Sequence, residues 1–331
     1  MRNIHKIYGF LVIVLVILSS SFIYTNKFAL STLELTGIAE KYEFFKPVIN
    51  KLMKKGVDSA FIYQLLSDSS TYFNEKYVQI SVPLYNPKES SNSIDSNRVY
   101  PQFANDFSIT QITKFIQDNY EILDKMEQKY SVSKDVVASL LWVESRYGSY
   151  LGNHNIVNVF LNQALVDETD FIEFNLKRLK EKYNPDEKET VELQNKLKAR
   201  SKSKANFAIN ELVALYHLQD KLPYKSTELK GSYAGAFGIS QFLPSSYSRW
   251  AVDGSGDGKI DLYDVNDAIF SAANYLANHG WKSDSTSQRK AVFAYNHSTV
   301  YVNTIFYLSQ RVEDYQTKLF FLPLKFQILS F

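Results

Sequence analysis

The sequence predicts a mainly α-helical protein, and two observations carry that prediction. Apolar residues recur at helical spacing over most of the chain, and no segment sustains the period-2 alternation of a half-buried strand. With 331 residues, of which 45% are hydrophobic, the chain is long enough to bury one large core or two lobes. We therefore expect a fold built by helix packing, with little sheet.

The composition excludes several classes of function. Lys and Arg number 37 against 35 Asp and Glu, so the chain has no broad basic field with which to hold a nucleic acid. It contains no cysteine, which excludes disulfides, thiolate metal sites, a cysteine nucleophile and a lipid-bearing cysteine. Aromatic residues make up 15% of the chain, and core packing accounts for most of them, although rings with a polar tip also suit the faces of sugars.

The N-terminus has the pattern of an export segment. Basic residues precede an apolar run over residues 7–18, and three serines follow it. The serines suit a cleavage site, but further apolar residues up to Tyr24 lengthen the run to nearly the roughly 20 residues that span a bilayer. We expect residues 1–24 to be a cleaved signal peptide or an uncleaved membrane anchor, with the rest of the chain exported to the periplasm or the outer face of the cytoplasmic membrane.

The predicted helices follow in order. Residues 44–73 have helical apolar spacing interrupted by Gly56, which predicts two short helices. Residues 86–105 collect proline, serine and asparagine and indicate a surface connection. The helical pattern resumes over residues 110–148, with a break near Tyr130. Further helices are predicted at residues 206–220, 244–251, 267–279 and 287–313.

A charged stretch covers residues 171–204. It is dense in Lys, Arg and Glu, and pairs such as Glu192 and Lys196 stand four residues apart, where opposite charges meet on one helix face. Mixed charge of this kind is typical of a hydrated helix surface. We therefore interpret the stretch as a solvated helical insertion rather than a binding surface.

A carboxylate interrupts the apolar face of the helix predicted to begin near Ser133. Glu144 lies on the stripe where the helical spacing requires a core residue. Burial disfavours the charged form of a carboxyl group and raises its pKa, as a general acid requires near neutral pH. Glu144 is a candidate catalytic acid; the alternative is a glutamate at the core rim, paired with Arg146 or with a lysine elsewhere. The other members of the stripe are Val137, Leu140 and Leu141.

The segment Gly231–Tyr247, GSYAGAFGISQFLPSSY, combines small residues with hydroxyl and amide side chains. Small residues let a ligand or another backbone approach closely, and a tight helix-packing turn explains the segment equally well. It is not a phosphate loop, because the lysine and glycine spacing of that motif are absent. Further on, Tyr295 and Asn296 are adjacent. The ring of the tyrosine could stack on a sugar, and the amide of the asparagine could hydrogen-bond to it.

Residues 253–264, DGSGDGKIDLYD, follow the pattern of an EF-hand calcium loop, with glycine at the sixth position. The usual glutamate at position twelve is replaced by the shorter Asp264, so a later acid such as Asp267 would close the site. We prefer a structural calcium clamp to an acidic turn capped by glycines. The other candidate ligands are Asp253, Ser255, Asp257 and Lys259, the last through its backbone carbonyl.

Taken together, these features resemble the membrane-bound lytic transglycosylase B family. Four motifs occur in the family's order: ESRYG from Glu144, GSYAGAFGISQFLPSS from Gly231, AVDGSGDGKIDLYDVNDAI from Ala251 and AYNHS from Ala294. Weaker similarity at FKPVINKLMKKGVDSAFIYQLLS lies upstream, whereas the charged stretch and the last dozen residues depart from the family.

The resemblance implies a mainly α fold: a lysozyme-like catalytic domain with extra helices and an EF-hand-like calcium loop. After the export segment, we expect an N-terminal helical region and linker at 25–109. The lysozyme-like transglycosylase domain is then expected at 110–315, including the calcium loop at 253–267, and a C-terminal tail at 316–331.

The resemblance also assigns residues. It makes Glu144 the single catalytic acid and base. The sugar contacts that it implies are Ser232, Gln241, Tyr275, Tyr295 and Asn296. The structural calcium ion that it implies would be held by Asp253, Ser255, Asp257, the carbonyl of Lys259, and Asp267. No organic cofactor is expected, and protein partners are not indicated.

The implied reaction cleaves peptidoglycan glycan strands without water. Most glycosidases use two carboxylates, whereas these motifs hold one acid, and the family uses the substrate's 2-acetamido group instead. Glu144 would protonate the oxygen between N-acetylmuramic acid and N-acetylglucosamine, then take the proton of the C6 hydroxyl as it closes onto C1, giving a 1,6-anhydro end. Two alternatives stay open: a hydrolytic muramidase on the same scaffold and a catalytically silent peptidoglycan-binding protein.

Overall fold

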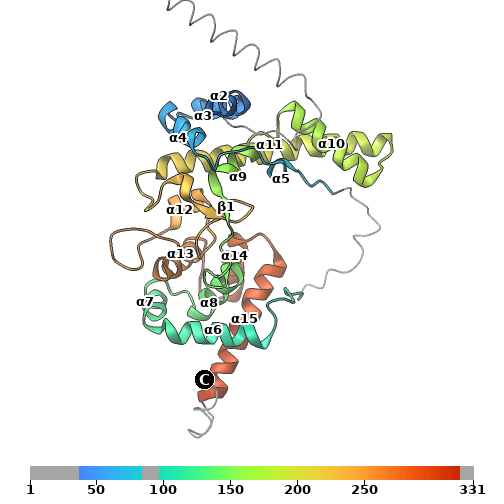
Figure 1. The fold of residues 1–331 in the computed structure, drawn as a ribbon. Coiled ribbons are helices and arrows are strands. Elements are labelled where there is room, and N and C mark those ends of the chain that lie inside the picture. The colour runs from blue at the N-terminus through green and yellow to red at the C-terminus, as the bar shows by residue number, and fades with distance from the viewer. Residues whose placement is uncertain (1–36, 84–96, 321–331) are drawn as a thin grey trace, which may run out of the picture. The chain divides into compact units, whose positions relative to one another are not determined.

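The computed structural model describes residues 37–83 and 97–320, and the predicted export segment and the last eleven residues of the chain lie outside these ranges. The described chain is mainly helical, and its sheet consists of two short paired strands (Figure 1). The predicted helical fold class is therefore confirmed. None of the helices in the described ranges is long and apolar enough to cross a membrane.

The described residues form two compact units that alternate along the chain. The first unit contains residues 37–83 and 157–213, and the second contains residues 97–156 and 214–320. The helices of the first unit are α2 (Ile38–Phe44), α3 (Lys46–Lys54), α4 (Ser59–Ser67), α5 (Glu75–Val78), α9 (Ile156–Gln163, from its second residue), α10 (Thr169–Tyr183) and α11 (Glu187–Leu218, as far as Val213).

The two short helices predicted on either side of Gly56 are α3 and α4. Gly56 has a φ of +83°, a left-handed conformation that ends α3 and that glycine adopts without strain. The side chain of Asp58 then caps α4 by accepting a hydrogen bond from the backbone N–H of Phe61 at 2.7 Å. Both helices turn apolar side chains, including Leu52 and Leu65, into the core of the first unit.

Buried asparagine side chains hold the chain segment that follows α4. Asn158 and Asn162 of α9 accept hydrogen bonds from the backbone N–H groups of Tyr72 and Asn74 at 3.0 and 2.9 Å. Asn175 of α10 accepts from the N–H of Ile80 at 2.7 Å and also donates to a nearby carbonyl. Each amide satisfies backbone groups that have no partner in a helix or sheet, so these asparagines are structural.

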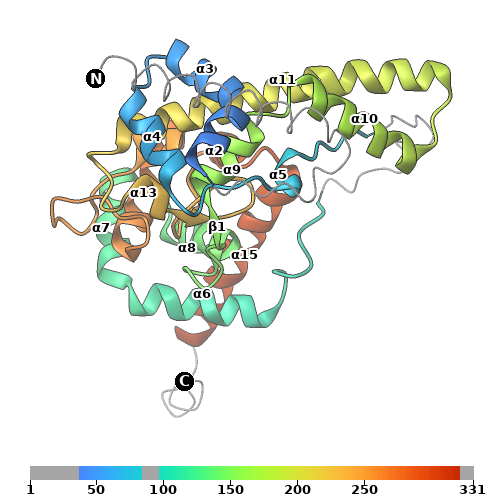
Figure 2. The same cartoon turned by 45° about the horizontal axis from the view of Figure 1, so that its top comes forward.

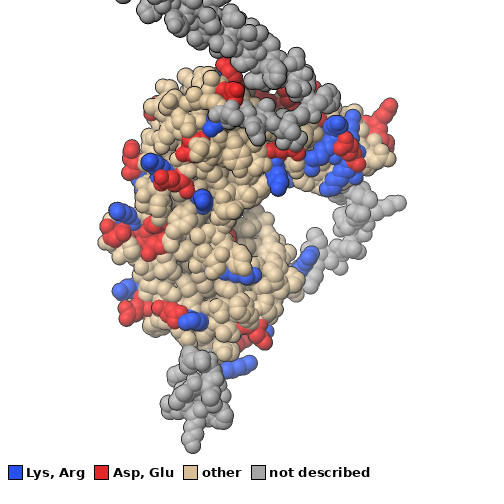
Figure 3. Space-filling model, in the orientation of Figure 1, with Lys and Arg blue, Asp and Glu red and all other residues tan. Residues whose placement is uncertain are grey.

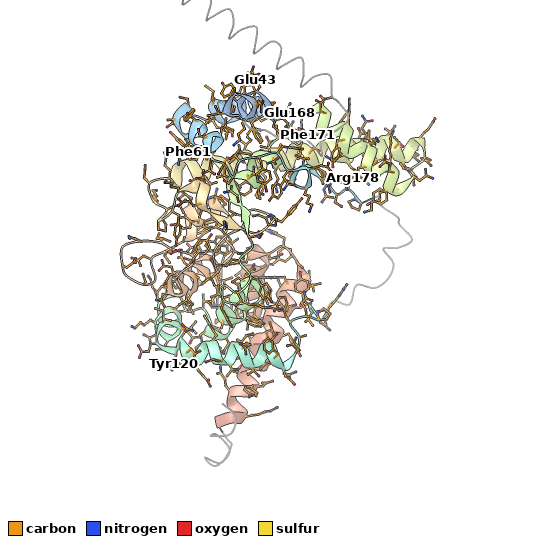
Figure 4. The ribbon with its side chains drawn as sticks, viewed as in Figure 1. Glu43, Phe61, Tyr120, Glu168, Phe171 and Arg178 are labelled. Carbon is orange, nitrogen blue, oxygen red and sulfur yellow. The ribbon has the colours of Figure 1, made fainter. Side chains whose placement is uncertain are left out.

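The charged stretch forms a helical hairpin, in which α10 and the first part of α11 lie side by side (Figures 1 and 2). Acidic and basic side chains are interspersed on its surface (Figure 3), and the predicted Glu192–Lys196 ion pair is present at 2.5 Å. Phe171 and Arg178 project from α10 (Figure 4), and Phe171 is buried. The hairpin thus has a packed apolar side as well as a hydrated one.

The second unit is arranged around α8, which packs chiefly against α15 and α6 and also contacts α13. The apolar stripe predicted on α8 is confirmed, because Val137, Leu140 and Leu141 have no exposed surface. The elements of this unit are α6 (Asp106–Asp118), α7 (Tyr120–Tyr130), α8 (Lys134–Ser145), β1 (His154–Asn155), η2 (Ser226–Glu228), β2 (Lys230–Gly231), α12 (Pro244–Trp250), α13 (Val265–Asn278), α14 (Ser285–Tyr295) and α15 (Thr299–Phe320).

The prediction of one helix over residues 287–313 was wrong, because the chain leaves the helical conformation between α14 and α15. Asn296 is extended, with φ −143° and ψ 117°, and it ends α14. The hydroxyl of Ser298 accepts a hydrogen bond from the backbone N–H of Tyr301 at 3.3 Å, as a residue at a helix start does. The break places the AYN motif at a helix end.

We expect Asn175→Ala to lower the free energy of unfolding by about 3 kcal/mol, because it leaves two buried backbone groups of the first unit without hydrogen bonds. Urea denaturation of the purified protein measures this change. Asn195→Ala, on the exposed face of α11, is the matched control and should change stability little. Equal stability of the two variants would contradict the structural role of Asn175.

Candidate active site

Three left-handed residues follow α8, which ends at Ser145, the residue after Glu144. Arg146, Tyr147 and Gly148 have φ values of +47°, +57° and +92°. The hydroxyl of Ser145 donates to the carbonyl of Ile239 at 2.7 Å and accepts from the N–H of Gly148 at 3.0 Å. These bonds offset the cost of a backbone conformation that residues with side chains rarely adopt.

Tyr147 fixes the same turn from the other side. Its ring stacks on Phe115 of α6 with the ring centroids 3.7 Å apart, and its hydroxyl donates to the carbonyl of Ala138 at 3.0 Å. The residue next to the catalytic candidate is therefore held by both packing and a hydrogen bond. These contacts tie the last turn of α8, which carries Glu144, to α6 and to the preceding turn of α8.

Glu144 has the environment of a proton donor. Its residue is partly exposed, yet desolvation of the carboxyl group raises its pKa to about 7, and the hydrogen bond from Tyr301 opposes this shift. The hydroxyl of Tyr301 donates to Oε1 of Glu144 at 2.5 Å. A carboxyl with this pKa is partly protonated at neutral pH, as a general acid requires.

The alternative pairing of Glu144 with a cation is not found. Among the described residues, no Lys, Arg or His lies within ion-pair distance of its carboxyl group. Arg146 is turned away and lies over the rings of Trp142 and Tyr150. The shift of the Glu144 pKa therefore reflects burial and not a charged neighbour.

Tyr301 was missed by sequence reasoning, because a tyrosine among apolar residues of a helix is expected to be part of the core. It belongs to α15 and has 1% of its surface exposed. Burial first, and then the nearby charge of Glu144, hold the pKa of Tyr301 well above its usual range, so it remains a donor. Its position shortly after the AYN motif was the available signal, but spacing alone did not assign it a role.

Aromatic rings gather beside Glu144, and they include two predicted sugar contacts. The rings of Tyr275 and Tyr295 have centroids 4.8 Å apart, and Phe242 lies within 5.8 Å of both. The hydroxyl of Tyr295 donates to the carbonyl of Ser240 at 2.5 Å, and that of Tyr275 to the carbonyl of Ala294 at 2.8 Å. Burial, and then the Glu144 charge, raise the pKa of Tyr295 well above its usual range, which shows that Tyr295 is near the acid.

The other predicted sugar contacts lie in the same unit. Gln241 has a φ of +50°, and its side-chain amide donates to the carbonyl of Gly238 at 2.8 Å. The hydroxyl of Ser232 accepts from the N–H of Ala236 at 3.1 Å. Asn296 is exposed. Within the described residues, none of these three side chains hydrogen-bonds to Glu144, so their roles as sugar contacts stay predictions.

The glycines of the same segment allow one stretch of backbone to approach another. A Cβ atom on Gly231 would lie 2.0 Å from the carbonyl oxygen of Ala236, and one on Gly238 would lie 2.4 Å from Cβ of Leu262. Gly238 also has a φ of +74°. At these two positions, the small residue is needed for close packing of this chain with itself, whatever ligand the segment binds.

In the predicted calcium loop, two of the proposed ligands lie close together. The hydroxyl of Ser255 donates a hydrogen bond to Oδ1 of Asp253 at 3.2 Å. Asp253 also accepts the N–H groups of Gly256 and Gly258, which takes up part of its acceptor capacity. Asp257 is exposed.

The second half of the loop is closed by hydrogen bonds. Asp264 caps α13, so it is engaged elsewhere. Asp267 is buried, and its Oδ1 accepts two backbone N–H groups and its Oδ2 accepts one, that of Asp261 at 2.6 Å. Oδ2 retains one free acceptor position. Over residues 37–83 and 97–320, no three acidic or histidine side chains converge as a metal-binding group.

Solved structures of other proteins have a similar fold. The fold is similar to that of lytic transglycosylase SltB1 from Pseudomonas aeruginosa, with a TM-score of 0.61 and 18% identity over 83% of this chain and 99% of that one. It is also similar to Escherichia coli Slt35 in complex with calcium, with a TM-score of 0.59 and 21% identity over 84% and 94% of the chains. This helical fold is thus that of solved lytic transglycosylases.

The sequence then identifies the family. Residues 40–294 match the transglycosylase SLT domain, and the chain belongs to that family. Membrane-bound lytic murein transglycosylase B of Escherichia coli is 34% identical over 161 residues, which is 49% of this chain. The match spans about a third, 35%, of the length of that relative.

We expect Glu144→Gln to be more stable than the wild type at pH 8, by about 3 kcal/mol, and the difference to vanish below about pH 4. The pKa of Glu144 is raised from 4.5 to about 7 by folding, so its ionisation opposes folding as pH rises through this interval. Denaturation at several pH values measures the difference. The exposed Glu121→Gln on α7 is the control, and a pH-independent difference for Glu144→Gln would contradict the assigned environment.

Proposed function

We propose that this protein cleaves peptidoglycan glycan strands as a lytic transglycosylase, with Glu144 as its single general acid and base. The observation that carries the proposal is the desolvated carboxyl group of Glu144, with a pKa of about 7 and a hydrogen bond from Tyr301. Membership of the transglycosylase SLT domain family supports the choice of reaction.

A mechanism with one carboxylate fits this environment. Two-carboxylate glycosidases place their acids about 5 to 9 Å apart, close enough to shift each other's pKa values. The pKa of Glu144 is shifted by burial and by Tyr301, with no contribution from a second carboxylate among the described residues. The substrate's own 2-acetamido group would therefore stabilise the positive charge that develops at C1.

The proton transfers follow from this arrangement. Glu144 donates its proton to the oxygen that leaves C1, and the hydrogen bond from Tyr301 stabilises the carboxylate that results. The carboxylate then accepts the proton of the C6 hydroxyl as this oxygen bonds to C1. Atoms balance without water, and the product is a 1,6-anhydro end. Proximity of C6 to C1 in the bound sugar favours this internal attack.

The sugar would be held beside Glu144 by predicted contacts in the same unit. Tyr275 and Tyr295 present rings near the acid, and amide and hydroxyl groups come from the glycine-rich segment and the end of α14. The contacts proposed are Ser232, Gln241, Tyr275, Tyr295 and Asn296. A hydrolytic muramidase would make the same first proton transfer, and its product distinguishes it from a lytic transglycosylase. A catalytically silent binding protein would not require a desolvated acid.

We also propose that the chain acts outside the cytoplasm. The N-terminal pattern of an export segment supports this location. The similar transglycosylase B of Escherichia coli is membrane-bound, which also supports it. Peptidoglycan itself lies outside the cytoplasmic membrane, so the proposed substrate and the proposed location agree.

A structural calcium ion is proposed for the loop at 253–267. Its ligands would be oxygens, as calcium prefers, and Ser255 and Asp253 already lie within hydrogen-bond distance of each other in the loop. Slt35 was solved in complex with calcium, which supports the same metal here. The ion would link the loop to α13 and would take no part in proton transfer. The ligands proposed are Asp253, Ser255, Asp257, the carbonyl of Lys259, and Asp267.

We expect Glu144→Gln to fold normally and to lower the rate of murein cleavage about a thousandfold, because the amide cannot transfer the proton. Muropeptide mass spectrometry after digestion of purified murein measures both rate and product. The wild type should release ends lighter by one water that borohydride does not reduce. Glu121→Gln is the control and should behave as the wild type.

Two outcomes would overturn this proposal in different ways. Reducible muramic acid ends as the main product would replace the transglycosylase by a hydrolytic muramidase. Undiminished cleavage by Glu144→Gln would show that Glu144 is not the catalytic acid.

We expect calcium to raise the melting temperature and a chelator to lower it, without either altering the product. A ligand that binds the folded state at a hundred times its dissociation constant adds about 2.7 kcal/mol of stability. Asp257→Ala should abolish the calcium-dependent part of this shift, whereas the exposed Asp220→Ala should keep it. If melting is insensitive to both calcium and chelator, the loop is an acidic turn held by Asp267.

A further inference from the structure

Residues 98–103 precede α6 and belong to no helix or strand, and side chains of α15 hold their backbone. The N–H of Tyr100 donates to the hydroxyl of Thr304 at 2.9 Å, and the side-chain amide of Asn303 donates to the carbonyl of Arg98 at 3.1 Å. Residues 98–103 are called here the Tyr100 segment. Two adjacent residues of α15 therefore fix its position along that helix.

The two side chains that hold the segment are themselves oriented by further hydrogen bonds. Thr304 has no exposed surface, and its hydroxyl donates to the carbonyl of Val300 at 2.7 Å, which directs its acceptor positions toward other donors. Arg289 of α14 donates to the side-chain oxygen of Asn303, so the NH2 group of this amide is left to bind the segment. The contact is therefore specific in geometry on both sides.

The Tyr100 segment lies beside Tyr301. The rings of Tyr100 and Phe103, with centroids 6.4 Å apart, pack against the hydrophobic core of the second unit, of which Tyr301 is a member. Thr304 follows Tyr301 by three residues, a spacing at which side chains are neighbours on a helix. The hydroxyl of Tyr100 also lies 3.4 Å from that of Ser298, which accepts from the N–H of Tyr301. The segment thus adjoins the hydrogen-bond donor of the proposed acid.

We propose that Asn303 and Thr304 are positioning residues for the proton transfer, and this inference rests on the function proposed above. They hold the Tyr100 segment beside Tyr301, and the segment keeps water away from the hydrogen bond that Tyr301 donates to Glu144. Both residues would act on the carboxyl group through the segment and not by direct contact.

The exclusion of water decides whether Glu144 can hold its proton. Desolvation is the largest cause that raises its pKa to about 7, and the hydrogen bond from Tyr301 opposes this shift. Burial, and then the charges of Glu144 and of neighbouring tyrosines that include Tyr100, hold the pKa of Tyr301 well above its usual range. If the segment is released, water reaches Tyr301, and the pKa of Glu144 falls toward its ordinary value.

The other titratable groups around Glu144 are tyrosines, which ordinarily titrate near pH 10. Tyr301 of α15 and Tyr295 at the end of α14 sense its charge directly. Tyr275 of α13 lies beside Tyr295, and Tyr100 lies beside Tyr301. Among the described residues, no charged side chain contributes to the shift of the Glu144 pKa. The charged residues of α6, which also packs against α8, are exposed: Asp106, Lys114 and Asp118.

The test is the pH profile of murein cleavage. The alkaline limb of kcat/KM reports the pKa of the general acid in the free enzyme. We expect Thr304→Val, which keeps the shape of the side chain and loses its hydroxyl, to move this limb to lower pH by about one pH unit. Activity should therefore fall about tenfold at pH 8 and little at pH 5.

Three further variants separate this effect from the loss of a threonine hydroxyl as such. Thr304→Ser restores the hydroxyl and should restore the wild-type profile. Thr110→Val on α6 is the matched control, because the Thr110 hydroxyl also donates to the carbonyl four residues earlier, at 3.0 Å, and it should keep the wild-type profile. Asn303→Ala removes the other contact at a partly exposed position and should move the limb in the same direction, so it replaces Thr304→Val if that variant does not fold.

A second measurement is independent of catalysis. The side-chain ¹³C signal of Glu144, assigned by its absence from Glu144→Gln, is titrated in the wild type and in Thr304→Val, and we expect the lower pKa in the variant. Equal loss of activity at every pH, with Glu144 titrating as in the wild type, would overturn the positioning role. If the wild type does not cleave murein but the titration still shifts, the proposed function fails and the effect of the segment on the carboxyl group stands. Circular dichroism checks that each variant is folded.

Discussion

The hydrogen bond between Tyr301 and Glu144 balances two opposing effects on one carboxyl group. Burial raises the pKa of Glu144 to about 7, and the tyrosine opposes this shift by stabilising the charged form. Burial alone would hold the proton too strongly to release it, and full hydration would hold it too weakly. The packing of α15 against α8 supplies both the apolar surroundings and the hydroxyl group.

The rest of the second unit keeps that carboxyl group in place. Ser145 joins the end of α8 to Ile239 of the glycine-rich segment, and the N–H of Ile239 donates to the carbonyl of Leu262 at 2.7 Å. The proposed calcium loop is therefore two hydrogen bonds from the residue next to Glu144. A link of this kind explains why Gly238 must be small, since any side chain there would push Leu262 away.

Most helices and the position of Glu144 could be predicted from the sequence, because helical spacing of apolar residues depends only on local structure. The apolar stripe identified α8 and Glu144, and helical spacing placed α3, α4, α12 and α13. Contacts between distant segments could not be predicted, since nothing in the local pattern links Tyr301 to Glu144 across 157 residues. The break after α14 was also missed, because it depends on two polar residues inside an otherwise helical pattern.

The separation of Tyr301 from Glu144 along the chain has a consequence for biosynthesis. Because Tyr301 of α15 lies 157 residues after Glu144, Glu144 acquires its hydrogen bond and much of its apolar surroundings only after these residues have been made. A nascent or partly threaded polypeptide leaves this glutamate hydrated, as an ordinary ionised side chain. The proposed acid thus acquires its raised pKa only when α15 has docked, whichever compartment the chain has reached by then.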